Sequence, residues 1–509
     1  MFTNKLLKLY FTRLIGIFAS ILSYTIVIPK LSSNLGAYGI YTVVVSLLML
    51  LQFADLGFLG AGQKYAAESY ARNDIDQEII ILSFVHWILF IVVVVYTAGL
   101  FYVYINPRTV FNNLENIDFA LAKSLMIIFI VFSPVIVMQR FVSAVFAIRI
   151  EDYIGQFVDI TSSILKIVST FYFFHGNRYD IIGYIFFIQL MNLLAAIIGL
   201  IIIKFRYNYN YLLVLSSFRF NRNIFQLTKK MALTSIILTV TWIIYYELDS
   251  VYVSKLYNPQ TVALFAIGIT MLTFSRSLMN TFFSPFQTKF NHLRGLNDET
   301  TLSNYFLRLI EWAFPISILP TICIIVLMRP LIISWIGFNY VNSILISRIM
   351  ITSLFFSFLS VPISYLAMAR EKFKFLLISS ITLPLFYAIF YFILRNRFGM
   401  NSLPIAKVAT IFINLLINLY LIKDVISQSF TRVLFNISKQ IVLPLILMGT
   451  LLYIMHSFWN IETGKNVMLF LKIVAIGGVC VILPMALYYY INPYTRVYML
   501  KVLGKLIKQ

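Results

Sequence analysis

Apolar runs of about 20 residues recur along the whole chain, with no polar domain between them. A run of this length can cross a bilayer as an α-helix, because each helical residue advances about 1.5 Å and the hydrocarbon core is about 30 Å thick. Of the 509 residues, 61% are hydrophobic and only 12% are charged, which leaves too few polar side chains to cover a water-soluble domain. The sequence therefore predicts an all-α polytopic membrane protein.

Polar and charged clusters divide these runs into about 14 membrane-spanning helices. The first run follows basic residues, as in a signal peptide, but it ends in IVIPKLSS without a small-residue cleavage site. We therefore expect it to be retained as a span. The predicted spans are 11–29, 38–59, 79–105, 119–139, 153–174, 181–203, 231–253, 261–283, 306–328, 344–367, 374–394, 402–422, 441–457 and 467–491.

The 40 Lys and Arg residues are distributed unevenly between alternate connections of these spans. The connections that lie on the same side as the two chain ends hold 24 of them, and the opposite connections hold 8. Because basic loops stay in the cytoplasm, both termini are predicted to be cytoplasmic. The most basic loop, 204–230, is predicted to orient the chain and to lie on anionic lipid headgroups, and we do not expect it to bind nucleic acid.

The two halves of the chain resemble each other at an offset of about 220 to 225 residues. The turn AIRIEDY (Ala147–Tyr153) parallels AMAREKF (Ala367–Phe373), and Asn192 parallels Asn414. We therefore predict two six-helix bundles, related by a pseudo-twofold axis along the membrane normal, and a terminal helix pair. The predicted domains are a first bundle at 1–203, a basic cytoplasmic linker at 204–230, a second bundle at 231–423, and the terminal helix pair with a basic tail at 424–509.

Ionisable residues deep inside the predicted spans are functional candidates, because a charge at the bilayer centre costs at least about 2.5 kcal/mol. Lys166 lies halfway along the fifth span, on one polar stripe with Asp159, and Arg276 lies on a second stripe in the eighth span. We predict that these residues bind an anionic substrate group, Lys as a point charge and Arg as a bidentate donor. Three further candidates, for which structural ion pairing is an equal alternative, are Lys123, Arg348 and Lys407.

Acidic residues inside spans can bind the proton or sodium ion that drives transport. Glu247 and Asp249 lie near the end of the seventh span among tyrosines, and Asp55 lies in the second span. Because tyrosine also collects at membrane interfaces, an ordinary interfacial position is an equal alternative for the first two. The sequence contains no phosphate-binding loop and no metal-ligand spacing, so we predict neither a cofactor nor a metal.

The amino-terminal region carries a recognisable signature. It runs from Arg13 through LGAYGIY (Leu35–Tyr41) and DLGF (Asp55–Phe58) to KYAAE (Lys64–Glu68). This signature resembles that of polysaccharide flippases of the Wzx type, in the multidrug/oligosaccharidyl-lipid/polysaccharide exporter superfamily.

The resemblance implies a transporter and not an enzyme. Such a protein would move undecaprenyl-pyrophosphate-linked repeat units of an O-antigen, capsule or exopolysaccharide to the outer leaflet of a bacterial inner membrane by alternating access. Its implied partners are the lipid-linked oligosaccharide, membrane lipids, a polysaccharide polymerase and chain-length proteins.

Two alternatives stay open. A drug or small-cation exporter could have the same fold, although a cavity with surplus cations should repel cationic substrates. A membrane polysaccharide polymerase is the enzyme alternative, and such enzymes usually carry their chemistry on a large external or cytoplasmic loop. The longest predicted connection here, Lys204–Lys230, has only about 27 residues.

Overall fold

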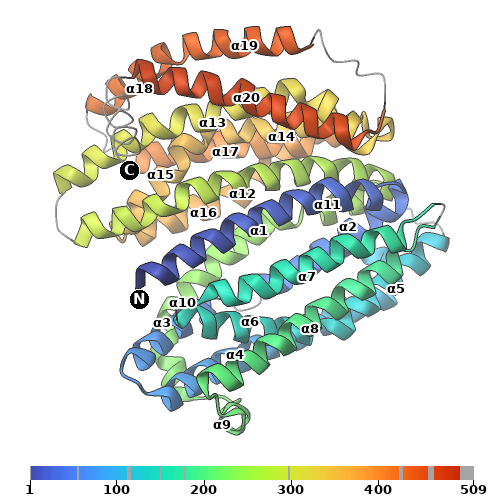
Figure 1. The fold of residues 1–509 in the computed structure, drawn as a ribbon, viewed down its shortest axis with the longest axis vertical. Coiled ribbons are helices and arrows are strands. Elements are labelled where there is room, and N and C mark those ends of the chain that lie inside the picture. The colour runs from blue at the N-terminus through green and yellow to red at the C-terminus, as the bar shows by residue number, and fades with distance from the viewer. Residues whose placement is uncertain are drawn as a thin grey trace. The chain divides into compact units, whose positions relative to one another are not determined.

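The computed structural model describes residues 2–53, 57–111, 116–149, 151–176, 178–295, 299–422, 428–456 and 464–492. All regular secondary structure in these ranges is helical (Figure 1). The predicted all-α membrane fold is therefore confirmed. The chain divides into two compact units, unit 1 at Met1–Ala263 and unit 2 at Leu264–Gln509. The predicted internal repeat and its domain boundaries stay a prediction.

Unit 1 contains long helices and several short breaks. Its elements are α1 (Phe2–Leu31), α2 (Leu35–Met49), the 3-10 turn η1 (Leu50–Phe53), α3 (Phe58–Ala71), α4 (Ile75–Ile105), η2 (Pro107–Thr109), α5 (Asn116–Phe132), α6 (Pro134–Ile148), α7 (Asp152–Phe173), α8 (Ile181–Tyr207), α9 (Tyr211–Ser216), α10 (Arg222–Trp242), the π-helix η3 (Ile243–Glu247) and α11 (Asp249–Leu256). Helix α12 (Pro259–Gly295) begins in unit 1 and continues into unit 2.

Unit 2 is built in the same way. Its further elements are α13 (Glu299–Ile336), η4 (Phe338–Tyr340), α14 (Ser343–Thr352), η5 (Ser353–Phe356), α15 (Ser357–Ala369), α16 (Phe373–Phe398), η6 (Gly399–Asn401), α17 (Ser402–Leu421), α18 (Gln428–Gln440), α19 (Val442–His456) and α20 (Val467–Ile491). Each of the 14 predicted spans overlaps one α-helix or two successive α-helices, and in three spans a short 3-10 or π-helical segment lies between the two.

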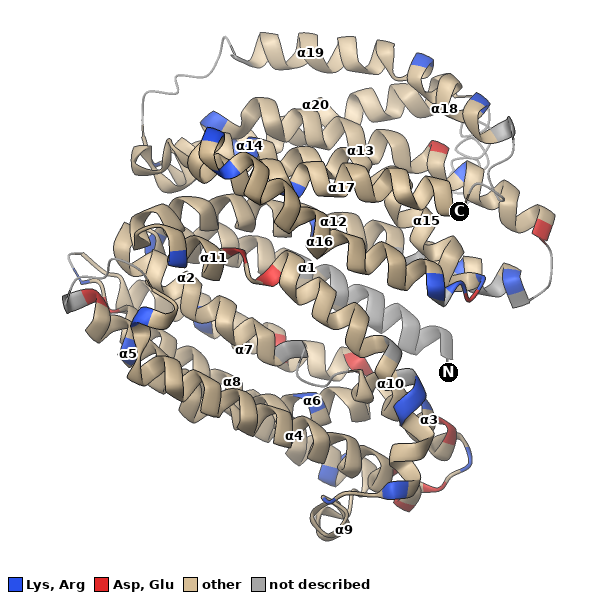
Figure 2. Cartoon of the chain, turned by 180° about the vertical axis from the view of Figure 1, so that it is seen from behind, with Lys and Arg blue, Asp and Glu red and all other residues tan. Residues whose placement is uncertain are grey.

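Length and apolarity alone qualify 8 of the described helices as membrane spans, or up to 10 if each bent pair counts as one span. The difference from 14 has local causes. The apolar part of α1 (Phe18–Leu31) and all of α2 are short, and α7 is too polar because it carries Asp159 and Lys166. In addition, α16 and α17 are counted as one continuous segment, Lys374–Leu421. Figure 2 shows that most charged residues lie toward helix ends, as expected for membrane-crossing helices.

The fourth predicted span is longer than expected and is bent. It was predicted at 119–139, but α5 and α6 together continue to Ile148 and meet at an angle of 45°. Pro134 lies at this bend. A proline inside a helix removes a backbone donor and its ring clashes with the preceding turn, so the helix kinks at this point.

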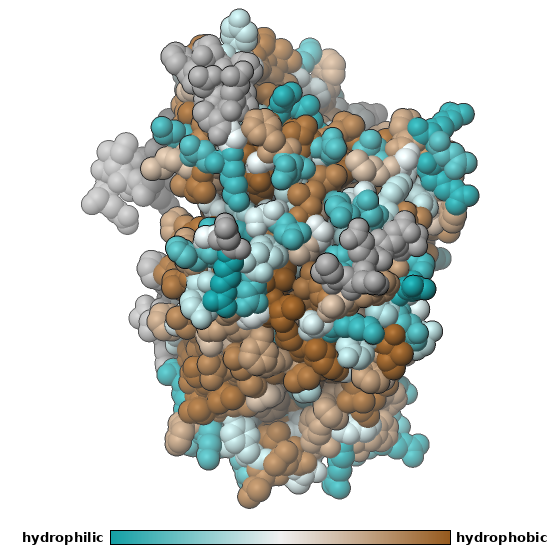
Figure 3. Space-filling view, turned by 90° about the vertical axis from the view of Figure 1, so that its right-hand side faces the viewer, coloured by the Kyte–Doolittle hydropathy of each residue, from teal (hydrophilic) through white to brown (hydrophobic). Residues whose placement is uncertain are grey.

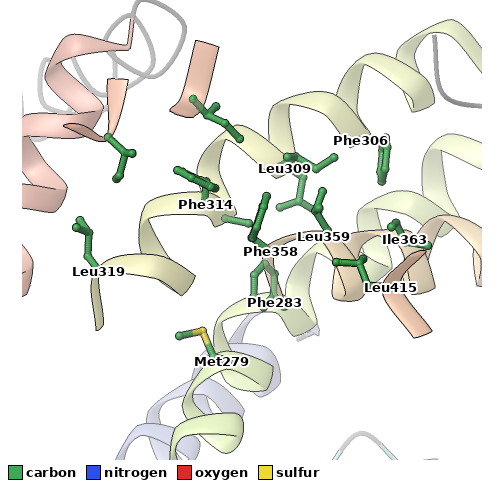
Figure 4. Close-up of a cluster of buried hydrophobic side chains, with 14 of the residues drawn as sticks. Met279, Phe283, Phe306, Leu309, Phe314, Leu319, Phe358, Leu359, Ile363 and Leu415 are labelled. Atoms are coloured by element: carbon green, nitrogen blue, oxygen red, sulfur yellow. The ribbon is translucent and has the colours of Figure 1, made fainter. Parts of the chain in front are cut away.

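Aromatic and aliphatic side chains form the core of unit 2 around α13 (Figure 4). Phe314 on α13 packs edge-to-face on Phe358 of α15, with ring centroids 4.8 Å apart. Phe283 and Phe306 are also buried in this cluster. Seen from the side in Figure 3, the surface alternates between hydrophobic and hydrophilic residues, as expected where membrane helices meet water.

Candidate functional site

A cavity of about 470 Å³ lies within unit 1. Its walls come from α2, the bent pair α5 and α6, α7 and α8. Apolar side chains make up much of the wall, and a smaller set of polar groups points into the space. The polar lining residues are Tyr41, Ser133, Gln139, Arg140, Ser143, Asp159, Gln189 and Asn192.

One wall of the cavity is formed by the helical segments on either side of the bend at Pro134. Phe132 and Ser133 line the cavity before the bend, and Gln139 and Arg140 line it after the bend. The Ser133 hydroxyl lies 3.0 Å from Thr97 Oγ1 on α4, within hydrogen-bonding distance. The kink therefore brings residues from two successive helices, with Ser133 between them, to the same space.

Two glycines allow the helices around the cavity to approach closely. A Cβ atom at Gly199 on α8 would lie 2.5 Å from Val142 Cγ1 on α6, and one at Gly155 on α7 would lie 3.1 Å from Phe146. Both glycines line the cavity. A larger residue at position 199 would push α8 away from α6 and change the cavity wall.

Lys166 is connected to the cavity through Asn192. The Lys166 Nζ atom donates to Asn192 Oδ1 at 2.6 Å, and Asn192 Nδ2 donates to Gln189 Oε1 at 3.3 Å. Gln139 Nε2 also donates to the Asn192 backbone carbonyl at 3.3 Å. This polar chain joins α7, α8 and α6, so the ammonium group stands one hydrogen bond behind the cavity wall.

The charges around the cavity give it a positive balance. Arg140 and Asp159 line it, and Lys166 interacts electrostatically with Asp159. One cation and one carboxylate in the cavity wall, with a second cation one hydrogen bond behind it, favour an anionic ligand, because charge interactions are strong where water is scarce. Amide groups such as that of Gln189 can hydrogen-bond sugar hydroxyls. The arrangement suits an anion attached to a polar group.

Lys407, the deepest predicted cation of unit 2, lies in a different environment. It is only 2% exposed, and its Nζ atom lies 5.7 Å from the centroid of the Tyr387 ring on α16. Asn414, about two turns further on the same stripe of α17, donates to the Ser379 carbonyl at 2.7 Å and to Thr382 Oγ1 at 2.8 Å. The stripe therefore packs against the neighbouring helix α16.

The other predicted cations are dispersed. Arg276 is half-buried on α12. The Nε atom of Arg348, on α14, donates to the Ile325 carbonyl of α13 at 3.1 Å. Lys123 is exposed on α5, with Nζ 5.8 Å from the centroid of the Tyr104 ring. Of the predicted binding residues, Asp159 and Lys166 lie on the same helix, α7, and interact electrostatically.

The predicted ion-coupling residues lie at a break in the seventh span. Glu247 ends the π-helix η3 and accepts a hydrogen bond from Trp242 Nε1 at 3.3 Å. Asp249 is buried in the first turn of α11, where a carboxylate favourably meets the helix dipole. Asp55 lies outside the described residues. π-Helical turns are frequent at functional sites, but no sequence pattern predicted this one.

Sequence reasoning missed Gln139, Arg140 and Gln189. The predicted fourth span ended at residue 139, so Arg140 lay outside it and was not among the predicted binding residues. In the structure α6 continues to Ile148, and Arg140 lines the cavity. The spacing of Gln189 and Asn192, three residues apart on one helix face, is the signal that could have identified the α8 wall.

No protein-family model and no curated protein matches this chain. Solved structures do match it. A lipid II flippase MurJ in an inward closed conformation has a TM-score of 0.66 and 15% identity, covering 96% of this chain and 99% of that chain. The inward-facing conformation of a multidrug resistance MATE family transporter of the MOP superfamily has a TM-score of 0.65 and 13% identity, covering 86% and 98%.

The outward-facing conformation of a MATE family transporter matches with a TM-score of 0.56 and 14% identity, covering 86% of this chain and 96% of that chain. The chain therefore has the fold that these transporters share. This is the fold of the superfamily that its amino-terminal signature resembles. These structures are described as flippases or transporters rather than as enzymes.

Proposed function

We propose that the chain is a flippase for undecaprenyl-pyrophosphate-linked oligosaccharides, working by alternating access in a bacterial inner membrane with both termini in the cytoplasm. The observation that carries the proposal is the unit 1 cavity, where Arg140 lines the wall and Lys166 is held behind it by Asn192. Shared fold with a structure described as a lipid II flippase adds support. So does the amino-terminal signature.

The cavity residues have separate roles in this proposal. Arg140 offers two parallel N–H donors to a phosphate, and Lys166 adds a positive charge that Asn192 orients. Gln139 and Gln189 then contact hydroxyl groups of the sugar next to the phosphates. Asp159 keeps the net charge low enough for the headgroup to leave again, since transport requires release as well as binding.

The test is a flipping assay in proteoliposomes with a lipid-linked oligosaccharide whose sugar is accessible to an added lectin. We expect Arg140→Gln with Lys166→Met to lower the flipping rate at least tenfold, because the anionic group loses both cations. The matched control is Arg72→Gln, which removes an exposed cation of unit 1 and should leave the rate unchanged. Wild-type flipping in the double variant would overturn the site.

A cell experiment tests the substrate class. In a deletion strain, lipid-linked repeat units should accumulate in the cytoplasmic leaflet and the surface glycan should be lost. Unchanged leaflet distribution together with unpolymerised units would favour the polymerase alternative.

A multidrug exporter is the second candidate function, because the carboxylate of Asp159 lines the cavity and MATE transporters share the fold. This alternative predicts efflux of cationic dyes from proteoliposomes, abolished by Asp159→Asn. The flippase proposal predicts no dye efflux, since the cavity carries more positive than negative charge.

Proton or sodium coupling through Glu247, Asp249 and Asp55 is part of the proposal. An imposed ion gradient should accelerate flipping by the wild-type protein, and Glu247→Gln or Asp249→Asn should remove that acceleration while leaving gradient-free exchange intact. Gradient-independent flipping in the wild type would exclude coupling through these residues.

A further inference from the structure

The linker segment 204–222, which runs from the last turn of α8 to the first residue of α10, is attached to the rest of unit 1 by three tyrosines. Tyr209 donates its hydroxyl to Glu78 Oε1 on α4, and Tyr207 donates to Glu151 Oε2 at 2.6 Å. Tyr211, at the start of the short helix α9, donates to the backbone carbonyl of Leu200. One side of residues 204–222 is therefore fixed against the bundle, at the edge of unit 1 (Figure 1).

A buried ion pair reinforces this attachment. Arg149 contacts Glu78 through two N–O distances of 2.7 and 3.0 Å, and its guanidinium lies 4.6 Å from the Tyr207 ring and 5.3 Å from the Tyr209 ring. Burial and the negative charge of Glu78 raise the pKa of Tyr209, so its hydroxyl stays protonated and remains a donor. The linker is thus held in one conformation.

The other side of the linker is exposed and combines apolar with basic side chains. Leu212 and Leu215 on α9 are 79% and 72% exposed, and Phe205 and Phe220 flank them with their side chains also exposed. The exposed cations on this side are Lys204, Arg219 and Arg222. None of the three forms an ion pair with another described residue.

We propose that this exposed side, consisting of Lys204, Phe205, Leu212, Leu215, Arg219 and Arg222, is a docking surface for the headgroups of anionic phospholipids. Apolar side chains beside cations, directly after a membrane-spanning helix, match the pattern of segments that lie in the membrane interface. The leucines insert between acyl chains while the three cations contact phosphates. Because the tyrosines already order the linker, lipid binding costs little further conformational entropy.

The charge of this surface indicates which lipid headgroup it binds. The surface carries three unpaired positive charges and no acidic side chain, so it favours phosphatidylglycerol or cardiolipin over zwitterionic phosphatidylcholine. The exposed leucines favour a lipid over a soluble anion, since only a lipid brings acyl chains to cover them. This surface is separate from the cavity, and its role does not depend on the transported molecule.

The experiment measures lipid binding to the full-length protein in detergent by native mass spectrometry, with phosphatidylglycerol and phosphatidylcholine of identical acyl chains. We expect the wild type to retain phosphatidylglycerol preferentially. The triple variant Lys204→Gln, Arg219→Gln, Arg222→Gln should lose affinity at least tenfold, since each cation near an anionic surface contributes about fivefold. Its matched control is Arg395→Gln with Arg397→Gln, which removes exposed charge from the end of α16.

A second variant separates the apolar contribution. Leu212→Ser with Leu215→Ser should weaken phosphatidylglycerol binding while its dependence on salt stays that of the wild type, because the cations are intact. Equal retention of the two lipids by the wild type, or equal losses in the triple variant and the α16 control, would overturn the proposal. Displacement of the lipid by inorganic pyrophosphate at equal concentration would also overturn it, as would preferential capture of RNA or an acidic peptide.

Discussion

The turns that follow α6 in unit 1 and α15 in unit 2 correspond in the predicted repeat. Each carries an arginine that pairs with a glutamate, but the two ion pairs differ in burial. In unit 1, Arg149 follows α6 and pairs with Glu78, and these side chains are 3% and 0% exposed. In unit 2, Arg370 follows α15 and contacts Glu299 at 2.5 Å, with side chains 15% and 47% exposed. Similar turn sequences therefore end in a desolvated pair in one unit and a solvated pair in the other.

The surroundings explain the difference. Arg149 is covered by the rings of Tyr70, Tyr207 and Tyr209, whereas Glu299 is shared between Arg370 and the exposed Arg294. A buried pair depends on both partners, because removing one leaves an uncompensated charge. An exposed pair can exchange its partner for water at little cost. Two turns with similar sequences can therefore contribute very differently to the stability of their units.

The largest expected effect comes from breaking the buried pair. Arg149→Met should lower the free energy of unfolding by about 3–5 kcal/mol, because Glu78 stays buried without its cation. The measurement is the thermal and denaturant unfolding of the full chain in detergent. Replacing both partners, with Glu78→Leu and Arg149→Met, should restore most of the loss. Wild-type stability of the single variant would show that Glu78 is solvated, and the ion pairs of the two units would then not differ in burial.

A smaller change tests the tyrosine that covers the pair. Tyr209→Phe keeps the ring and removes only the hydroxyl that donates to Glu78, so we expect a loss of about 1.5 kcal/mol in the free energy of unfolding. Tyr391→Phe on α16 is a matched control with an expected change near zero. Equal effects of the two variants would mean that the hydroxyl makes no net contribution to unit 1.

The spans and polar stripes could be predicted because they depend on local periodicity. The stripe through Lys407 and Asn414 follows from helical spacing, and the structure places those residues on one buried face of α17. Spacing does not determine which helix covers that face. The sequence therefore could not show that the α17 stripe packs against another helix, whereas Asp159 and Lys166 on α7 lie at a cavity.

Contacts between distant segments could not be predicted. Glu78 and Arg149 are 71 positions apart, and only the packing of α4 against α6 brings them together. The fourth span was predicted to end at residue 139, and the sequence did not indicate that the helix continues to Ile148. That continuation places Arg140 in the cavity wall.

Lys166 in unit 1 and Lys407 in unit 2 test whether the two units differ in their contribution to transport. Lys166→Met should lower flipping about tenfold, equivalent to about 1.4 kcal/mol in the activation free energy, because the cavity loses a cation. Lys407→Met should leave flipping within about twofold, because Lys407 lies against Tyr387 of α16 and does not line the unit 1 cavity. Both variants are assayed in proteoliposomes after their unfolding is measured. A larger transport defect in Lys407→Met would move the functional site to unit 2.

The smallest expected effect is at the exposed pair. Arg370→Met should change the free energy of unfolding by only about 0–1 kcal/mol, because water and Arg294 both remain available to Glu299. The same detergent unfolding measurement compares it directly with Arg149→Met, and adding Arg294→Met tests whether the second arginine compensates. The change should shrink further at high salt, since exposed charges are screened. A loss as large as that of Arg149→Met would mean that Glu299 is desolvated in the membrane, so that both turns would hold buried pairs.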